Sequence, residues 1–278
     1  MALIGYLGPA GTYSEEAAHH LCDGDEQQFK PFVTIDAAIW AVAKGEVDTS
    51  IVPIENSLGG SVTVTLDILA HEVDLYITAE FVAAIRHNLL VKQDQESEAI
   101  EMILSHPQAL AQCRHVLQTL YPGVSFKPVD STAEAARLVA EGTGRMAAIS
   151  SAKAAKQYGL SIVNHDVQDN LTNCTRFVRL ERVPQKTCSA GPCKTSIVCE
   201  INGKKPGSLC EILQEFSIRN VNLTRIESRP ARTGLGRYIF FLDMEGRLND
   251  AVIAEAVAAV QKKSFWFKNL GTYAVGSY

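Results

Sequence analysis

The stretch Ser125–Val163 reads SFKPVDSTAEAARLVAEGTGRMAAISSAKAAKQYGLSIV, in which short apolar runs alternate with alanine-rich segments. Ser131 stands directly before one such segment and Glu134 lies three residues later, the spacing of a helix capping box. The alternation predicts strands and helices in turn, over 125–129, 132–140, 146–149, 152–158 and 160–163. Strands that alternate with helices form a mostly parallel sheet covered on both faces, which makes this an α/β protein.

An earlier part of the chain follows the same pattern. Thr34-Ile-Asp-Ala-Ala38 matches Thr132-Ala-Glu-Ala-Ala136, and both pentads stand where a helix is expected to begin. Two similar units that face each other would enclose a cleft, which is a favoured place for a ligand. Strands are expected over 3–7, 29–33, 47–53 and within 75–91, and helices over 15–21, 35–44, 62–70 and 108–120.

The last third of the chain has a pattern of its own. The segment Val183–Cys193, VPQKTCSAGPC, lacks apolar periodicity and is predicted to be a linker. Beyond it, Pro206 is expected to open one helix and Asn249 to cap another. The expected order is strand, helix, strand, strand, helix, strand, over 194–201, 206–216, 221–228, 237–244, 250–262 and 266–270. This order is typical of a ferredoxin-like domain.

Composition excludes several classes of protein. A net charge of -5 argues against nonspecific nucleic-acid binding, so any site for an anion must be built locally. No apolar run approaches the length of a membrane span, and Met1–Gly8 fits a first strand, so a cytoplasmic protein is expected. The histidines lack metal-binding spacing. Four cysteines fall in helix or strand patterns and are expected to be reduced: Cys22, Cys113, Cys199 and Cys210.

Polar residues follow two of the expected strands in the first unit, at the ends where α/β sheets bind ligands. The turn Gly8–Ser14 precedes a helix, so its N–H groups and the hydroxyl of Thr12 would either seat an anion or simply cap the helix. In Pro53–Ser57, Glu55 would either face a ligand or accept hydrogen bonds from loop N–H groups. Both interpretations remain open for each motif.

Two polar motifs belong to the second unit. In Ser105–Gln108, His106 is held extended by the following proline, and the glutamine shares a helix face with Gln112. Asp130–Thr132 contains Ser131, which would either cap its helix or face the cleft. These residues are candidates for the opposite wall of the cleft.

The segment Asn173–Phe177, NCTRF, combines the neutral hydroxyl of Thr175 with the permanent cation of Arg176. In order, GPxGTxS, PIENSxxG, SHPQ, DST and NxTRF resemble the catalytic domain of the prephenate dehydratases over residues 1–180. The resemblance implies a two-lobed fold like that of type II periplasmic binding proteins, with Thr175 as the catalytic residue and Arg176 as a carboxylate partner. It also implies Asn56, Ser105, Gln112 and Asp130 as residues of the cleft. The same motifs contain four further substrate-binding candidates: Thr12, Ser57, Gln108 and Phe177.

Two motifs in the C-terminal part resemble the ACT regulatory domain of the same family. Glu227-Ser-Arg-Pro230 is similar to its ESRP motif, and Pro206-Gly-Ser-Leu209 departs from its Pro-Gly-Ala-Leu at Ser208. The resemblance implies L-phenylalanine as an allosteric effector, bound in a homo-oligomer that is a dimer or a dimer of dimers. A domain that serves only for assembly is the alternative. The two motifs contain the candidate effector-binding residues Gly207, Ser208, Leu209, Glu227, Ser228, Arg229 and Pro230. Asn220, Val221 and Asn222 enter the next expected strand and are further candidates, whose carbonyls would meet the ammonium group.

The resemblance also implies an activity, the conversion of prephenate to phenylpyruvate with loss of CO2 and water in L-phenylalanine biosynthesis. No cofactor, metal, nucleic acid or membrane is expected to take part. The expected domains are a catalytic domain over 1–182, able to fold by itself, and an ACT domain over 194–278. Alternative functions are an arogenate dehydratase, with the same chemistry on the aminated substrate, and a non-catalytic small-anion binding protein.

Overall fold

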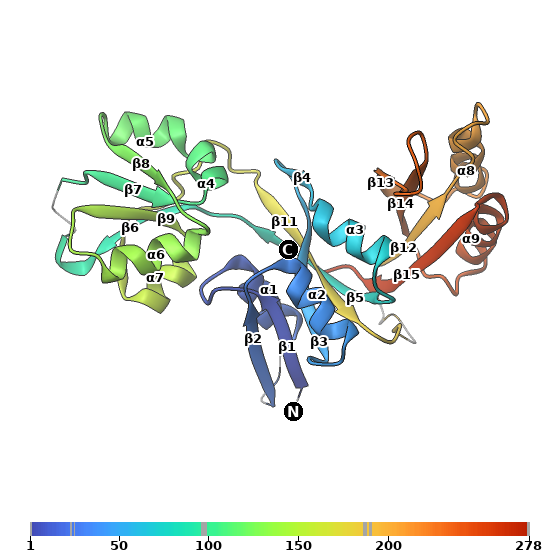
Figure 1. Ribbon diagram of the computed structural model, residues 1–278, viewed down its shortest axis with the longest axis horizontal. Coiled ribbons are helices and arrows are strands. Elements are labelled where there is room, and N and C mark those ends of the chain that lie inside the picture. Colours follow the sequence, from blue (N-terminus) through green and yellow to red (C-terminus); the bar gives the residue numbers. More distant parts are fainter. Residues whose placement is uncertain are drawn as a thin grey trace.

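A computed structural model describes residues 2–22, 24, 26–95, 99–185, 188 and 191–276. It shows three α/β blocks in a row, with the N-terminal block in the middle (Figure 1). We call the middle block lobe 1, and the block that contains the green helices at the left of Figure 1 lobe 2. The third block, in orange and red at the right, is the C-terminal domain. No helix in the described ranges is both long and apolar enough to cross a bilayer.

Lobe 1 holds the beginning of the chain and one strand that returns to it. Its elements are β1 (Ala2–Leu7), α1 (Tyr13–Leu21), β2 (Gln27–Phe32), α2 (Ile35–Ala43), β3 (Thr49–Asn56), β4 (Gly60–Ser61), α3 (Thr63–His71), β5 (Tyr76–Ala84) and β11 (Cys174–Glu181). Strand β1 is parallel to β2 and β3, whereas β11 is antiparallel to both β3 and β5. Helix α1 packs on one face of this sheet, and α2 with α3 packs on the other.

Lobe 2 is a smaller sheet between two pairs of helices. Its elements are β6 (Asn88–Lys92), the 3-10 turn η1 (Gln93–Gln95), β7 (Met102–Ser105), α4 (Pro107–Gln112), α5 (Arg114–Leu120), β8 (Ser125–Pro128), α6 (Thr132–Glu141), β9 (Met146–Ser150), α7 (Ala152–Tyr158) and β10 (Leu160–Asn164). The strand order is β10-β6-β9-β7-β8. The chain crosses between the lobes twice, at 85–87 and at 165–173.

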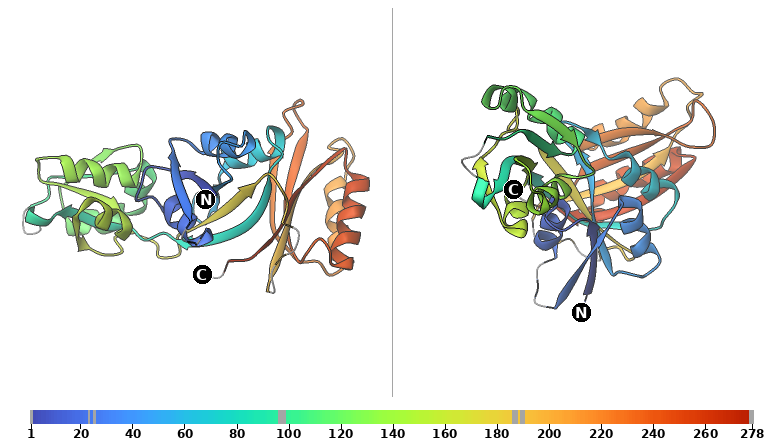
Figure 2. Two further views of the ribbon diagram at one scale, coloured as in Figure 1. Left: turned by 90° about the horizontal axis from the view of Figure 1, so that it is seen from below. Right: turned by 60° about the vertical axis from the view of Figure 1, so that its left-hand side comes forward.

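The C-terminal domain has its helices on one face only (Figure 2). Its elements are β12 (Cys193–Glu200), α8 (Ser208–Ser217), β13 (Leu223–Pro230), β14 (Tyr238–Glu245), α9 (Ala251–Lys263) and β15 (Trp266–Ala274). The strand order is β13-β14-β12-β15, and β15 pairs with β5 through Ala274 and Ala79. One sheet therefore continues from lobe 1 into the C-terminal domain.

The face of this domain that carries no helices packs on lobe 1. Ile239, Phe241 and Leu270 from the C-terminal sheet belong to the same buried cluster as Leu66 of α3 and Ile77 of β5. Apolar side chains that share one cluster lose their cover together if either part is removed. Lobe 1 and the C-terminal domain therefore share one buried core.

The predicted elements occur in the predicted order, but β4, η1 and β7 were not anticipated, and the extended stretch 75–91 is divided into β5 and β6. The helix predicted over 108–120 is broken at Cys113, whose φ of -114° and ψ of 4° end α4. Helix α9 has Asp250 rather than Asn249 at its N-cap, and α8 begins two residues after Pro206. Both large sheets are mixed rather than mostly parallel, because strands carry the chain back and forth between the lobes.

The four cysteines that were expected to be reduced are free in the structure. Cys22, Cys113 and Cys199 are buried and free, and the exposed Cys210 is also free, as expected. In the linker, a disulfide joins Cys188 to the cysteine that begins β12. This bond was not predicted from the sequence.

Candidate active site

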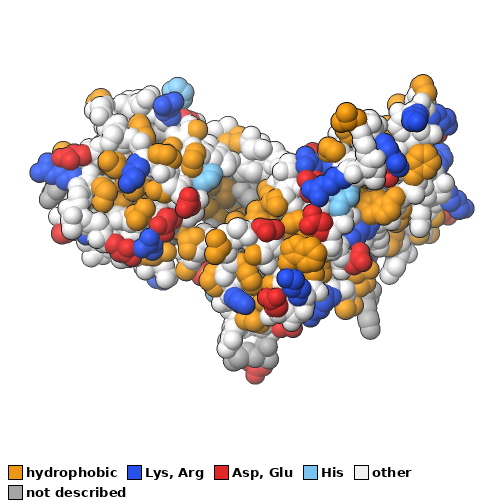
Figure 3. Space-filling view, in the orientation of Figure 1, with side chains coloured by type: hydrophobic (Ala, Val, Ile, Leu, Met, Phe, Trp, Pro, Cys, Tyr) orange, Lys and Arg blue, Asp and Glu red, His pale blue; other side chains and the backbone are white. Residues whose placement is uncertain are grey.

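A cavity of about 280 Å³ lies between the lobes, where Figure 3 shows the surface hollowed. Lobe 1 contributes the N-terminus of α1 and the end of β3, and lobe 2 contributes α4 and the N-terminus of α6. Strand β11 contributes Thr175 and Phe177. The structure brings seven of the ten predicted substrate and catalytic residues to this cavity: Thr12, Asn56, Gln108, Gln112, Asp130, Thr175 and Phe177.

Two predicted residues, Ser57 and Ser105, hold the backbone instead of facing the cavity. The Ser105 hydroxyl is fully buried and donates to Ile149 O at 2.8 Å, which joins β7 to β9. The Ser57 hydroxyl donates to Thr172 O at 3.0 Å and accepts from Cys174 N at 2.9 Å. Their predicted role in contacting substrate is corrected to one of support, since both hydroxyls already have protein partners.

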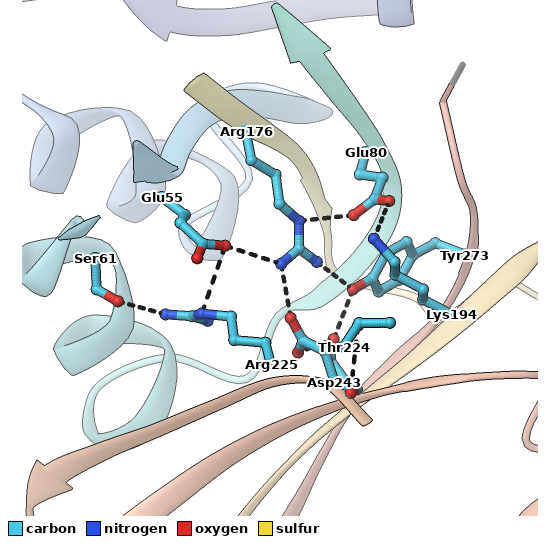
Figure 4. Close-up of polar contacts among 10 residues, drawn as sticks. Glu55, Ser61, Glu80, Arg176, Lys194, Thr224, Arg225, Asp243 and Tyr273 are labelled. Atoms are coloured by element: carbon cyan, nitrogen blue, oxygen red, sulfur yellow. Dashed lines mark hydrogen bonds and ion pairs between the residues drawn. The ribbon is translucent and has the colours of Figure 1, made fainter. Parts of the chain in front are cut away.

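Arg176 requires the larger correction. Its guanidinium lies on the face of β11 opposite to the cavity, where it contacts Glu80, Asp243 and Tyr273 (Figure 4). Successive side chains of a strand point to opposite faces, so Thr175 and Arg176 cannot both line the cleft. The predicted role of Arg176 as a carboxylate partner of the substrate is therefore wrong. Strand alternation was the signal in the sequence that would have shown this.

Two backbone N–H groups determine how the Asn56 amide is oriented. Leu58 N and Gly59 N both donate to Asn56 Oδ1, at 3.0 and 2.7 Å, so Nδ2 must point the other way. Nδ2 donates to Thr175 Oγ1 at 2.9 Å and to Asn173 Oδ1 at 2.8 Å. The Thr175 oxygen thus accepts a hydrogen bond from the protein, and its own hydrogen is left for a group in the cavity.

The side-chain hydrogen bonds continue from Asn173 through Gln112 to His87. His87 also lines the cavity, and it was not predicted from the sequence. Asn173 Nδ2 donates to Gln112 Oε1 at 3.0 Å, so this oxygen also faces His87 Nε2, 3.2 Å away, as an acceptor. Nε2 therefore carries a proton, while Nδ1 is buried without a partner in the described part of the chain. Burial lowers the pKa of His87, and the bond to Gln112 offsets this only in part, so the ring is neutral near pH 7.

No lysine or arginine is among the described residues that line the cavity. A negatively charged ligand would instead meet two helix N-termini. Thr12 Oγ1 caps α1 by accepting from Glu15 N at 3.3 Å, and Ser131 Oγ caps α6 by accepting from Glu134 N at 3.0 Å. The first-turn N–H groups of a helix have no intrahelical partners and lie at the positive end of its dipole. This arrangement suits carboxylate groups.

Polar contacts also join the two lobes directly. Lys153 of α7 forms an ion pair with Glu15 of α1 at 2.9 Å, and Ser151 Oγ donates to Gly11 O at 3.1 Å. Burial raises the pKa of the Glu15 carboxyl, but hydrogen bonds from Gly11 N and Lys153 outweigh this and hold the pKa below its ordinary value. Glu15 is therefore charged at neutral pH, and the two lobes are joined electrostatically.

The predicted effector residues do not meet within one copy of the chain. Gly207–Leu209 lie at the first turn of α8, whereas Asn220–Asn222 follow its last turn. At 1.5 Å per residue, the ten residues of α8 place these two segments about 15 Å apart. One small molecule cannot contact both segments of the same copy.

The third predicted segment, Glu227–Pro230, lies at the end of β13. Ile239 of β14 pairs with Arg229 of β13 on one side and with Glu200, the last residue of β12, on the other. The end of β13 therefore lies at the same edge of the sheet as the end of β12, after which the chain continues to α8. The Arg229 guanidinium binds Asp67 of α3 with contacts of 2.8 and 2.9 Å. The structure therefore uses this arginine to join the C-terminal domain to lobe 1.

Comparison with known proteins identifies the family. Residues 4–185 match the family model described as prephenate dehydratase, and residues 196–261 match the model described as ACT domain. The chain belongs to the prephenate dehydratase family. Its fold is the one expected of that family, a two-lobed α/β portion followed by a βαββαβ ACT domain.

Relatives match this prephenate dehydratase family member over nearly its whole length. The prephenate dehydratase of Mycobacterium bovis is 38% identical over 284 residues, which cover 99% of this chain and 88% of that protein. The Arabidopsis thaliana protein named arogenate dehydratase/prephenate dehydratase 2, chloroplastic, is 39% identical over 282 residues, covering 98% and 72%. A crystal structure of a prephenate dehydratase from Arthrobacter aurescens, in complex with L-Phe, has a TM-score of 0.90 at 35% identity and covers 98% and 90%.

Proposed function

We propose that the cavity between the lobes binds prephenate and converts it to phenylpyruvate, with Thr175 assisting the departure of the ring hydroxyl. The hydrogen bond from Asn56 Nδ2 to Thr175 Oγ1 is the observation that carries this proposal. It orients the threonine so that its own O–H can donate into the cavity. The catalytic portion comprises residues 1–182.

The reaction needs little covalent chemistry from the protein. The bond between the ring and its carboxylate breaks, and its electron pair enters the ring as CO2 leaves. The carbon–oxygen bond to the ring hydroxyl breaks at the same time, and the departing hydroxide takes up a proton to become water. The product ring is aromatic, so the driving force lies in the substrate. The protein must bind two carboxylates and stabilise the charge that develops on the leaving oxygen.

A neutral hydroxyl suits the second task. Thr175 is a weak acid, so it acts chiefly as a hydrogen-bond donor that is already aimed at the leaving oxygen. A donor placed in this way typically stabilises a transition state by about 3 kcal/mol. Asn56 keeps the Thr175 oxygen occupied as an acceptor, which prevents the hydroxyl from turning away from the substrate.

The carboxylates would be held by backbone rather than by cations. The first turns of α1 and α6 supply N–H groups on opposite walls, and no lysine or arginine lies among the described lining residues. Leu7, Ile85 and Phe177 form an apolar part of the wall. A carboxylate that faces such a wall loses hydration, which raises its energy and favours its loss as CO2.

Substitution of Thr175 tests the proposal directly. Thr175→Ala should lower kcat for prephenate by roughly 10²–10³-fold with little change in KM, because only a transition-state contact is lost. Thr175→Ser keeps the hydroxyl and should retain most of the activity. Formation of phenylpyruvate, followed by absorbance, gives both constants. Unchanged turnover in Thr175→Ala would rule out this role for Thr175.

Arogenate is the alternative substrate, since the Arabidopsis thaliana relative is named for both activities. The two substrates differ only in a keto or an amino group on the side chain. Measuring kcat/KM for each with the same preparation separates them, and a higher value for arogenate would reverse the assignment. A protein that binds both without turning either over would be the non-catalytic alternative.

We also propose that residues 194–278 bind L-phenylalanine between two copies of the chain. Since Gly207–Leu209 and Asn220–Asn222 lie at opposite ends of α8, a ligand that contacts both needs one segment from each copy. The Arthrobacter aurescens relative was solved in complex with L-Phe. Calorimetry should show binding that lowers activity, and sedimentation should show a dimer or a dimer of dimers. Absence of binding heat would leave the domain with an assembly role only.

A further inference from the structure

Two adjacent strands each place neighbouring side chains on opposite faces of one sheet. Thr175 of β11 pairs with Asn56 of β3, and both side chains face the cavity. One residue along, Arg176 pairs with Glu55, and both side chains face the C-terminal domain. The proposed catalytic hydroxyl is therefore separated by one peptide unit from a cation that is buried between domains.

Three side chains accept hydrogen bonds from the Arg176 guanidinium, which uses all its nitrogens, and Glu55 forms a longer ion pair with it at 3.6 Å (Figure 4). Nε donates to Glu80, Nη1 to Asp243 and Nη2 to Tyr273 Oη, each at 2.7 Å. Glu80 belongs to β5 of lobe 1, but Asp243 and Tyr273 belong to β14 and β15 of the C-terminal sheet. Arg176 is only 8% exposed. Removing a buried cation from its partners is costly, so this contact is rigid.

The two C-terminal partners are held in turn by their own sheet. Ser196 Oγ lies 2.6 Å from Asp243 Oδ1 and 2.6 Å from Tyr273 Oη. Lys194 Nζ donates to Glu80 at 2.7 Å, so the central strand β12 also reaches the acid on β5. Asp243 and Tyr273 therefore move only with the C-terminal sheet as a whole.

We infer that Asp243 and Tyr273 are positioning residues for the dehydration, and that they act on Thr175 through Arg176 and the backbone of β11. The inference rests on the proposed role of Thr175. A displacement of about 1 Å at a reacting group is enough to cost two orders of magnitude in rate. The C-terminal sheet thus supports the active site in addition to its proposed binding of an effector.

A second ion pair between the same two domains provides a matched control. Asp67 of α3 binds Arg229 at 2.8 Å and Arg232 at 3.0 Å. This contact also joins lobe 1 to the C-terminal domain, but α3 carries no residue that lines the cavity. Loss of the Asp67 contact therefore weakens docking without disturbing β11.

The test compares Asp243→Asn and Tyr273→Phe with Asp67→Asn in the full chain. Each substitution keeps the shape of the side chain. The two network variants should lower kcat for prephenate by about tenfold or more, with KM within about twofold, because the substrate carboxylates are held elsewhere. Asp67→Asn should keep the kcat of the unsubstituted chain. Circular dichroism melts of all three show whether each variant is folded at the assay temperature.

Three results would overturn the inference. Folded Asp243→Asn and Tyr273→Phe variants with unchanged kcat would show that the network has no effect on Thr175. A rise in KM alone in these two variants would show that the network affects substrate binding. An equal loss of kcat in Asp67→Asn would show that docking of the C-terminal domain in general is what matters. If Asp243→Asn does not fold, the kcat of Tyr273→Phe, which changes no charge, still tests the inference. An active Thr175→Ala would instead contradict the proposed function, so the two failures are distinguishable.

Discussion

The amide of Asn56 determines the direction of the hydrogen bonds along one wall of the cavity. Backbone donors occupy its oxygen, so its nitrogen serves Thr175 and Asn173, and Asn173 in turn serves Gln112. His87 completes the row as a donor from Nε2. Each side chain therefore has one permitted orientation, although only Asn56 contacts Thr175 directly.

Replacement of this amide by a carboxylate should lower turnover strongly while preserving the fold. Asn56→Asp keeps the oxygen that Leu58 and Gly59 bind, but it removes the donor to Thr175 and adds a negative charge beside it. We expect kcat to fall by about 10²-fold or more. Asn202→Asp is a suitable control, because Asn202 also accepts from a backbone N–H, that of Lys204 at 3.1 Å. Equal kcat in both variants would contradict this account.

His87 predicts a pH dependence of stability. Burial lowers its pKa below the ordinary value of 6.5, so below that pH the unfolded chain binds more protons than the folded chain. The stability due to the neutral ring is present above this value and is lost as the pH falls through the folded pKa. The melting temperature should fall more steeply from about pH 6.5 to 5 in the unsubstituted chain than in His87→Gln. Equal slopes would show that His87 is not the group that titrates.

At the scale of elements, a glycine allows β15 to meet β5. Gly271 has a φ of +117°, and a Cβ there would lie 2.6 Å from Ile77 O. The two strands share only the pair Ala274 and Ala79, so their approach is one of backbone against backbone. The junction of the two sheets therefore depends on the absence of a side chain.

A glycine-to-alanine substitution at this junction should lower the free energy of unfolding by more than the same substitution at a glycine with free space around it. Gly271→Ala adds both a positive-φ strain and a clash with β5, and we expect a loss of about 3 kcal/mol or more in free energy of unfolding. Gly123→Ala is the control, because its φ is +85° and nothing lies within 4 Å of its added Cβ. It should cost roughly 1–2 kcal/mol. Urea denaturation of both variants measures the difference, and equal losses would exclude the clash.

For the whole molecule, the shared core predicts the outcome of truncation. A chain that ends at Arg182 leaves Leu66 and Ile77 without their C-terminal cover, and Arg176 loses Asp243 and Tyr273. We expect a lower melting temperature and a tendency to aggregate, not the independent catalytic domain that the linker pattern suggests. Circular dichroism melts of residues 1–182 and of the full chain test this. Matching melting temperatures would mean that lobes 1 and 2 fold independently of the C-terminal domain.

Local patterns in the sequence determined the order of the elements and the family. The caps at Thr34 and Ser131 both accept the hydrogen bonds expected of them, from Ala37 N and Glu134 N. Motifs at the ends of β3 and at the start of α4 and α6 meet at the cavity, because those ends lie side by side in this topology. Caps, turns and periodicity act between near neighbours in the chain, and so they can be recognised in the sequence.

Only the tertiary structure decided which side chains face each other across the molecule. His87 and Gln112 are 25 residues apart, and Arg176 lies 67 residues from Asp243 and 97 from Tyr273. No local spacing indicates such pairs, because they form where the lobes and the C-terminal sheet pack together. The tautomer of His87 depends on a row of amides that begins at two backbone donors. The burial that makes Arg176 a structural cation depends on a domain that the sequence separates from it by a linker.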